Sequence, residues 1–177
     1  MSDTGFFNPQ ELQQLIGIRE GMRVADFGSG SGEVAVMLAR IVGPDGEVTA
    51  IDVLPSAIES VQARAKHEKL QNIETVRADL DVPGSSRLPD ASQDVVYCAN
   101  ILWQSPKKAE ILAEAARVLK PGGMLATVEW NQKKELGPPQ ESRVSQDSLK
   151  TFITSAGLTL TGSFPAGAYH YGLMAKK

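Results

Sequence analysis

The chain has 177 residues, of which 42% are hydrophobic and 22% charged, and its formal net charge is −3. These values are ordinary for one soluble globular domain, and no lysine- or arginine-rich run predicts a nucleic-acid surface. No apolar run is long enough to cross a bilayer, and the single cysteine, Cys98, excludes an internal disulfide and a thiolate metal cluster. We therefore expect a single cytoplasmic domain over residues 1–177, with no nucleic-acid partner, no membrane insertion and no metal.

Hydrophobic periodicity predicts helices and strands that alternate along the chain. Asn8, Pro9 and Glu11 form a typical helix start, and the apolar stripe that follows ends at Gly17. A short apolar strand, a glycine-rich segment and a second helix come next, and the alternation then repeats. The expected helices lie at about 8–17, 34–41, 55–65, 106–119 and 149–156, and the expected strands at 23–27, 47–52, 73–78, 94–100, 124–130, 158–164 and 168–175.

This alternation predicts an α/β fold with a Rossmann-like, doubly wound sheet of seven strands. Right-handed crossovers make such a sheet mostly parallel and place helices on both of its faces. Pro165-Ala-Gly167 predicts a final hairpin that adds one antiparallel strand. Ligands bind such sheets outside the carboxyl ends of the strands, where strand order reverses, so we expect the glycine-rich segment there.

The glycine-rich segment 28–32, Gly-Ser-Gly-Ser-Gly, lets a ligand approach the backbone closely. A dinucleotide-binding loop is one interpretation, although Glu33 stands where that motif has its last glycine. Asp26, just before the loop, would repel a phosphate but could accept hydrogen bonds from an ammonium group. Asp52, which ends the second strand, could hold both hydroxyls of a ribose. A ribose with an ammonium group and no phosphate describes S-adenosylmethionine.

The chain resembles the class I S-adenosylmethionine-dependent methyltransferases, and most of all the small type 11 and quinone-biosynthesis group. The segments that carry the resemblance follow one another along the chain: Val24-Ala-Asp-Phe-Gly-Ser-Gly-Ser-Gly32, Ala50-Ile-Asp-Val53, Arg77-Ala-Asp-Leu80, Asp94-Val-Val-Tyr-Cys-Ala-Asn100 and Ala116-Arg-Val-Leu-Lys-Pro-Gly-Gly-Met-Leu125. The resemblance implies an enzyme that transfers a methyl group in line to a small molecule and releases S-adenosylhomocysteine.

The resemblance also implies where the cofactor binds. Asp26 would lie near its amino group, Asp52 would hold the ribose hydroxyls and Asp79 would accept from the adenine amino group. The full implied set is Asp26, Phe27, Gly28, Ser29, Gly30, Gly32, Asp52, Val53, Asp79, Leu80, Asn100 and Ile101. Local capping is the alternative for the acids, with Asp26 and Asp79 capping loops and Asp52 capping the turn into Pro55.

The substrate is expected beside the amino-terminal helix, the ends of the fourth and fifth strands and the final hairpin. The candidate contacts there are Phe7, Trp103, Trp130, Arg143 and Tyr169. Arg143 is a candidate clamp for an anionic group, and His170 is the candidate general base, on the opposite strand face from Tyr169 and Tyr171. The alternatives are rim packing for the tryptophans, an ion pair with Glu141 for Arg143 and a buried edge-strand position for His170.

Two other functional classes stay open on the sequence. An NAD-dependent oxidoreductase would bind its dinucleotide at the same loop, and a non-catalytic module would bind S-adenosylmethionine without transferring its methyl group. The chain has no room for an inserted lid domain, so either the cleft is open or the second subunit of a homodimer covers it.

Overall fold

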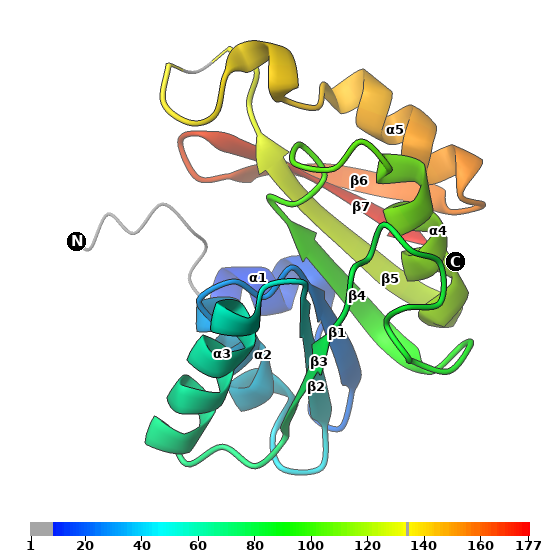
Figure 1. Ribbon diagram of the computed structural model, residues 1–177. Helices are drawn as coiled ribbons and strands as arrows, with labels where there is room; N and C mark the ends of the chain where they lie inside the picture. Colours follow the sequence, from blue (N-terminus) through cyan, green and yellow to red (C-terminus); the bar gives the residue numbers. More distant parts are fainter. Residues whose placement is uncertain (1–8, 134) are drawn as a thin grey trace.

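A computed structural model describes residues 9–133 and 135–177, and their centre is a seven-stranded sheet with the order β3-β2-β1-β4-β5-β7-β6 (Figure 1). β1 to β5 run parallel, and β7 is antiparallel to both of its neighbours. The strands are β1 Arg23–Phe27, β2 Glu47–Asp52, β3 Ile73–Arg77, β4 Gln93–Ala99, β5 Leu119–Trp130, β6 Thr159–Ala166 and β7 His170–Lys176. The expected fold, with its antiparallel carboxyl-terminal strand, is confirmed.

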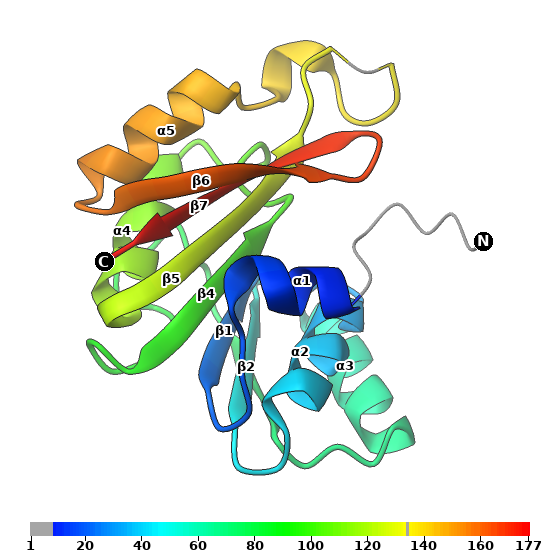
Figure 2. The ribbon, with the colours of Figure 1, turned by 180° about the vertical axis from the view of Figure 1, so that it is seen from behind.

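Helices cover both faces of the sheet (Figures 1 and 2). Alternation along β1 turns Val24 to one face, where Leu38 and Val61 pack, and Ala25 to the other, where Ile111 and Leu149 pack. The first face carries α1 Pro9–Ile16, α2 Glu33–Val42 and α3 Pro55–His67; the second carries α4 Lys108–Val118 and α5 Gln146–Ser155, with a 3₁₀ turn, η1, at Gln140–Ser142. None of the helices in the described residues has the length and apolar character needed to cross a bilayer.

The order of the strands reverses between β1 and β4, which lie side by side at the centre of the sheet. The loops that follow these two strands therefore meet at the carboxyl edge. One is the glycine-rich loop 28–32, and the other is the segment 100–107 before α4. The sequence placed the glycine-rich loop at this reversal, and the structure confirms it.

Two turns differ from the sequence expectation. Leu119 already pairs with Gln93, five residues before the expected start of the fifth strand at 124, and pairing resumes between Val95 and Met124. The intervening residues bulge out of β5, and Gly122 adopts a φ of +80° there. The final hairpin turns at 167–169 and not at 165–167. β6 can extend through Pro165 because it is an edge strand, where a missing backbone donor is tolerated.

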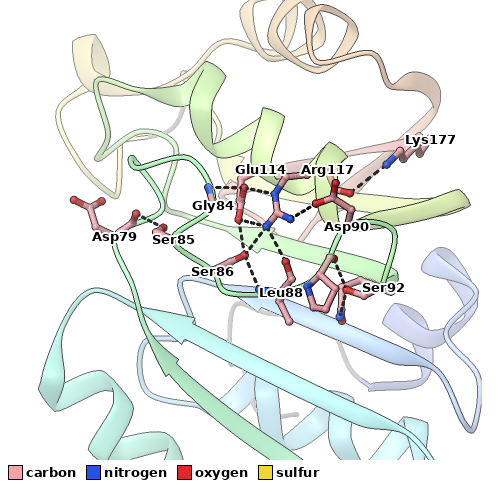
Figure 3. A network of polar contacts seen from close by, with 12 residues as sticks. Asp79, Gly84, Ser85, Ser86, Leu88, Asp90, Ser92, Glu114, Arg117 and Lys177 are labelled. Carbon is pink, nitrogen blue, oxygen red and sulfur yellow. Dashed lines mark hydrogen bonds and ion pairs between the residues drawn. The ribbon is translucent and has the colours of Figure 1, made fainter.

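An ion pair within α4, between the buried Glu114 and the partly exposed Arg117, is hydrogen-bonded to the loop after β3 (Figure 3). The side chain of Glu114 is 1% exposed, lies 2.7 Å from Arg117 and accepts hydrogen bonds from Ser86 Oγ (2.5 Å) and Gly84 N (3.0 Å). Arg117 also donates to the carbonyl of Leu88 (2.9 Å). Burial raises the pKa of Glu114, but the hydrogen bonds from Arg117, Ser86 and Gly84 outweigh it and lower the pKa to about 2. This pair fixes the loop that borders the carboxyl edge.

Replacing Arg117 by alanine should lower the free energy of unfolding by about 3 kcal/mol at pH 7, because Glu114 would stay buried without its cation. The exposed pair of Lys150 and Asp147 has the same i,i+3 spacing and a 3.1 Å separation, so Lys150→Ala is the matched control. Its expected effect is within about 0.5 kcal/mol. Urea denaturation measures both, and equal effects would contradict a structural role for the buried pair.

Candidate functional site

A pocket of about 430 Å³ opens at the carboxyl edge, between the glycine-rich loop, the start of α2 and the end of β4. Predicted and unpredicted residues line it together: Asp26, Gly28, Ser29, Gly30, Ser31, Glu33, Val34, Met37, Tyr97, Ala99 and Asn100. The structure thus brings together the loop, the acid before it and the end of the fourth strand, as the sequence predicted.

Two glycines of the loop have different physical roles. At Gly28, with φ +80°, an added Cβ would lie 2.0 Å from Ile101 Cγ2, so this glycine lets the two edge loops touch. At Gly30, with φ +50°, an added Cβ would meet no atom within 4 Å. The loop is hydrogen-bonded to the end of β2. Gly28 N donates to Ile51 O at 2.8 Å, and Gly30 N donates to Asp52 Oδ2 at 2.9 Å. The backbone at Gly30 is therefore fixed and open to a ligand.

Asp26 is the most unusual group in the pocket. It is 2% exposed, and its Oδ2 has no hydrogen-bond partner among the described residues. Burial, and then the nearby charge of Asp52, raise the pKa of Asp26 to about 7. Asp26 therefore caps no loop through Oδ2, which weakens the local-capping alternative. A buried carboxylate without a partner suits a cationic ligand group.

Asp52 and Asp79 both make local capping bonds. Asp52 Oδ1 accepts from Leu54 N at 2.9 Å, and Asp79 Oδ1 accepts from Asp81 N at 3.0 Å. Each carboxylate keeps further lone pairs for a ligand, so capping and ligand binding are compatible. Asp79 borders a second hollow of about 440 Å³, where Val53 is 50% exposed. An exposed apolar side chain here would suit the flat face of a ligand ring.

Phe27 and Leu80 do not present their side chains to the pocket. Phe27 is fully buried and Leu80 is 7% exposed, and both lie in the core on the α4 and α5 face. Strand alternation sends the side chain of Phe27 to the opposite face from Asp26. Only their backbone is left for a ligand.

Unsatisfied polar atoms gather at this edge of the sheet. Buried polar atoms in folded proteins almost always have a partner, so each exception asks for an explanation. Asn100 also adopts a left-handed backbone, with φ +57°, which is rare for a residue with a side chain. Among the described residues, five buried polar atoms without a hydrogen-bond partner lie here: Asp26 Oδ2, Ser29 Oγ, Asn100 Oδ1, Trp103 Nε1 and Glu129 Oε2.

Tyr97 lines the pocket and was missed by the sequence reasoning. It pairs in register with Asp26 and points to the same face of the sheet. Burial raises the pKa of Tyr97 above its ordinary value, so the phenol stays protonated and can donate a hydrogen bond. A tyrosine within an otherwise apolar strand was the available signal, but its position beside Asp26 depends on the register of two strands far apart in the sequence.

Arg143 is not available as a clamp for an anionic substrate. Its guanidinium donates to the carbonyls of Pro138 (2.8 Å), Asn131 (2.6 Å) and Leu136 (3.1 Å). It is 6% exposed and holds together the loop between β5 and α5. The expected clamp is therefore wrong.

Trp130 and His170 pack against each other at the far end of the edge. Their ring centroids are 4.1 Å apart and their planes are tilted by 41°. A Cβ on Gly137 would lie 2.4 Å from the Trp130 ring, so that ring is also covered by the loop, as the rim-packing alternative expected. Burial, and then the charge of Arg143, lower the pKa of His170 from 6.5. The imidazole is therefore neutral near pH 7.

The remaining substrate candidates are less closely associated with the pocket. His170 and Tyr171 lie on opposite faces of the sheet, as strand alternation predicted. Tyr171 packs in the core beneath α4 and α5, and its hydroxyl donates to Val144 O at 2.7 Å. Tyr169 is 39% exposed, and Trp103 is half-buried against the same core as Tyr171. Phe7 lies outside the described residues.

The reversed strand order, the antiparallel last strand and the acid-flanked glycine loop define a Rossmann-like fold of the class I methyltransferase kind. A family model described as a methyltransferase domain matches residues 18–162. The chain belongs to this methyltransferase domain family, and the expected resemblance to class I S-adenosylmethionine-dependent methyltransferases is confirmed.

Two curated relatives support the assignment to the methyltransferase domain family. The chain is 33% identical over 159 residues to a ubiquinone/menaquinone biosynthesis C-methyltransferase of Ectopseudomonas mendocina, covering 89% of this chain and 59% of that protein. It is 31% identical over 124 residues to a demethylmenaquinone methyltransferase of Listeria welshimeri, covering 70% of this chain and 51% of that protein. The chain thus spans little more than half the length of these curated relatives.

A solved structure is similar along nearly the whole chain. It is a SAM-dependent methyltransferase from Aquifex aeolicus, with a TM-score of 0.88 and 28% sequence identity. The match covers 98% of this chain and 92% of that one.

The raised pKa of Asp26 predicts a pH-dependent effect of Asp26→Asn on stability. The folded protein keeps a proton up to about pH 7 that the unfolded chain loses near 3.8, so wild-type stability falls between these values. The asparagine variant lacks this loss. Its stability relative to wild type should rise by about 2 to 3 kcal/mol between pH 5 and pH 8.

Urea denaturation at the two pH values measures this difference, and all other titrating groups are common to both proteins. The exposed Asp45→Asn, which removes a surface carboxylate, is the control. A pH-independent effect of Asp26→Asn would show that Asp26 is ionised in the folded protein throughout.

Proposed function

We propose that the protein is an S-adenosylmethionine-dependent methyltransferase that acts on a small molecule. The observation that carries the proposal is the buried carboxylate of Asp26, whose Oδ2 has no partner among the described residues. An ammonium group is the natural counterpart of such a carboxylate, and a pyrophosphate is not. Family membership supports the same cofactor.

The residues of the edge fit the other parts of this cofactor. Gly30 presents an open backbone for the ribose and methionine parts, and the oxygens of Asp52 can accept from the ribose hydroxyls. Val53 would lie against adenine, and Asp79 would accept from its amino group. Ser29, Asn100 and Tyr97 supply further polar groups around the methionine end. When bound, the cofactor supplies a methyl group that is already activated, so the protein mainly has to orient the acceptor.

A dinucleotide fits this edge less well. Glu33 begins α2, where a pyrophosphate would need the helix amides and a neutral neighbour. Asp26 adds a second carboxylate to the same pocket. Calorimetric titration with S-adenosylhomocysteine and with NADH separates the two classes, and we expect binding of the first alone.

The substrate class rests on likeness to relatives. The two curated relatives are named for methyl transfer in quinone biosynthesis, and we propose a small molecule of comparable size for this chain. The two alternatives for the cleft, open or covered by the second subunit of a homodimer, both stay predictions. Incubation of wild-type protein with radiolabelled S-adenosylmethionine and a metabolite extract tests the activity, and cofactor binding without any labelled product would favour a non-catalytic module.

Asp52→Ala should weaken binding of S-adenosylhomocysteine by about tenfold or more, because hydrogen bonds from hydroxyls to a carboxylate are lost. Gly30→Val should abolish binding, since its side chain would enter the space that is open in the structure. Calorimetry gives the affinities and circular dichroism confirms folding. An unchanged dissociation constant in either folded variant would remove that residue from the site.

We also propose His170 as the general base. Its neutral imidazole near pH 7 can accept a proton, and it stands at the carboxyl edge opposite Trp130. His170→Ala should lower methyl transfer by about a hundredfold or more, with cofactor affinity nearly unchanged. Full activity in a stable His170→Ala protein would show that His170 is not the general base. A parallel loss of turnover and thermal stability would favour a packing role for His170.

A further inference from the structure

A second buried carboxylate, that of Glu129, lies beneath the loop that follows β4. Glu129 is near the end of β5 and has no exposed surface. Its Oε1 accepts a hydrogen bond from Leu102 N at 2.9 Å, and the neighbouring amides of Ile101 and Trp103 also act to lower the pKa of the carboxylate. The loop is therefore held to the neighbouring strand through this side chain.

The segment held in this way begins at Asn100, which lines the pocket, and includes Ile101, which packs against the glycine-rich loop. Asn100 has its left-handed backbone at the start of the segment, and its amide donates to Val128 O at 2.8 Å. Ile101 fills the space above Gly28, where even a Cβ would clash. A shift of this segment would therefore move both the polar group of Asn100 and the wall against the glycine-rich loop.

Stability alone does not explain a carboxylate at this position. Burial raises the pKa of Glu129 to about 7 in spite of the donated hydrogen bonds and the charge of Lys108, and its Oε2 has no partner among the described residues. Well-packed apolar residues commonly match or exceed the stability of buried charges. What this carboxylate provides is an acceptor for the Leu102 amide, which would otherwise be unpaired under the loop.

We infer that Glu129 is a positioning residue of the cofactor site: by binding the amide of Leu102 it fixes the left-handed backbone of Asn100 and the contact of Ile101 with Gly28. The inference rests on the proposed cofactor site. Glu129 itself touches neither cofactor nor acceptor and acts through the loop. It also links the end of β5, on the substrate side, to the glycine-rich loop.

The test compares Glu129→Ala and Glu129→Gln with Thr127→Val. Thr127 is buried on the same face of the same strand and donates to Leu173 O at 3.2 Å, away from the loop, so it controls for loss of a buried polar group in β5. Calorimetry with S-adenosylhomocysteine gives the dissociation constants, and urea denaturation gives the stabilities.

Glu129→Ala should weaken binding by about tenfold or more, because the Leu102 amide loses its acceptor and the loop loses its tie to β5. Glu129→Gln should weaken it by about threefold, since its carbonyl oxygen still accepts from part of the segment. Thr127→Val should stay within about twofold of wild type even where its stability falls.

Affinities in both Glu129 variants that equal wild type would overturn the inference, as would losses in Thr127→Val that match those of Glu129→Gln. If Glu129→Ala does not fold, the comparison of Glu129→Gln with Thr127→Val decides alone. If the wild-type protein does not bind S-adenosylhomocysteine, the proposed function itself is refuted. Failure of the proposed function is thus distinguished from failure of the inference about Glu129.

Discussion

Burial of the Asp26 carboxylate is the constraint around which the carboxyl edge is built. Asp26 is the penultimate residue of the central strand β1, at the point where strand order reverses, and it is buried between the paired strands β2 and β4. A carboxylate in such a place destabilises the ionised protein unless a cation arrives. The open backbone at Gly30 and the acceptors of Asp52 stand beside it. The edge is thus arranged for a ligand that carries both an ammonium group and hydroxyls.

The buried acids of this protein fall into two kinds. Glu114 is surrounded by Arg117, Ser86 and the amide of Gly84, and its pKa is lowered to about 2, so its charge is fully compensated. Asp26 and Glu129 have pKa values raised to about 7, and each keeps an oxygen without a partner among the described residues. Glu114 lies away from the pocket and stabilises the fold. The other two flank the loop after β4 from opposite faces, where a cost in stability is tolerated for function.

The sequence predicted the features that depend on neighbours along the chain. Alternating periodicity identified the sheet, and the acids at the strand ends were placed correctly at its carboxyl edge. Tyr97 and Glu129 were not found, because their roles come from register with Asp26 in β1 and from amides of a loop in space, neither of which has a local signal. Arg143 was misjudged for the same reason, since its carbonyl partners are gathered only by the folded loop.

Proton exchange on ligand binding tests the central claim most directly. Calorimetry near pH 6.5, in two buffers with different ionisation enthalpies, counts the protons released. The account predicts that S-adenosylhomocysteine releases about half a proton or more, because its ammonium group ionises Asp26, whose pKa is about 7 in the free protein. Methylthioadenosine, which lacks the amino acid end, should bind without this release. Equal proton release for the two ligands would contradict the account.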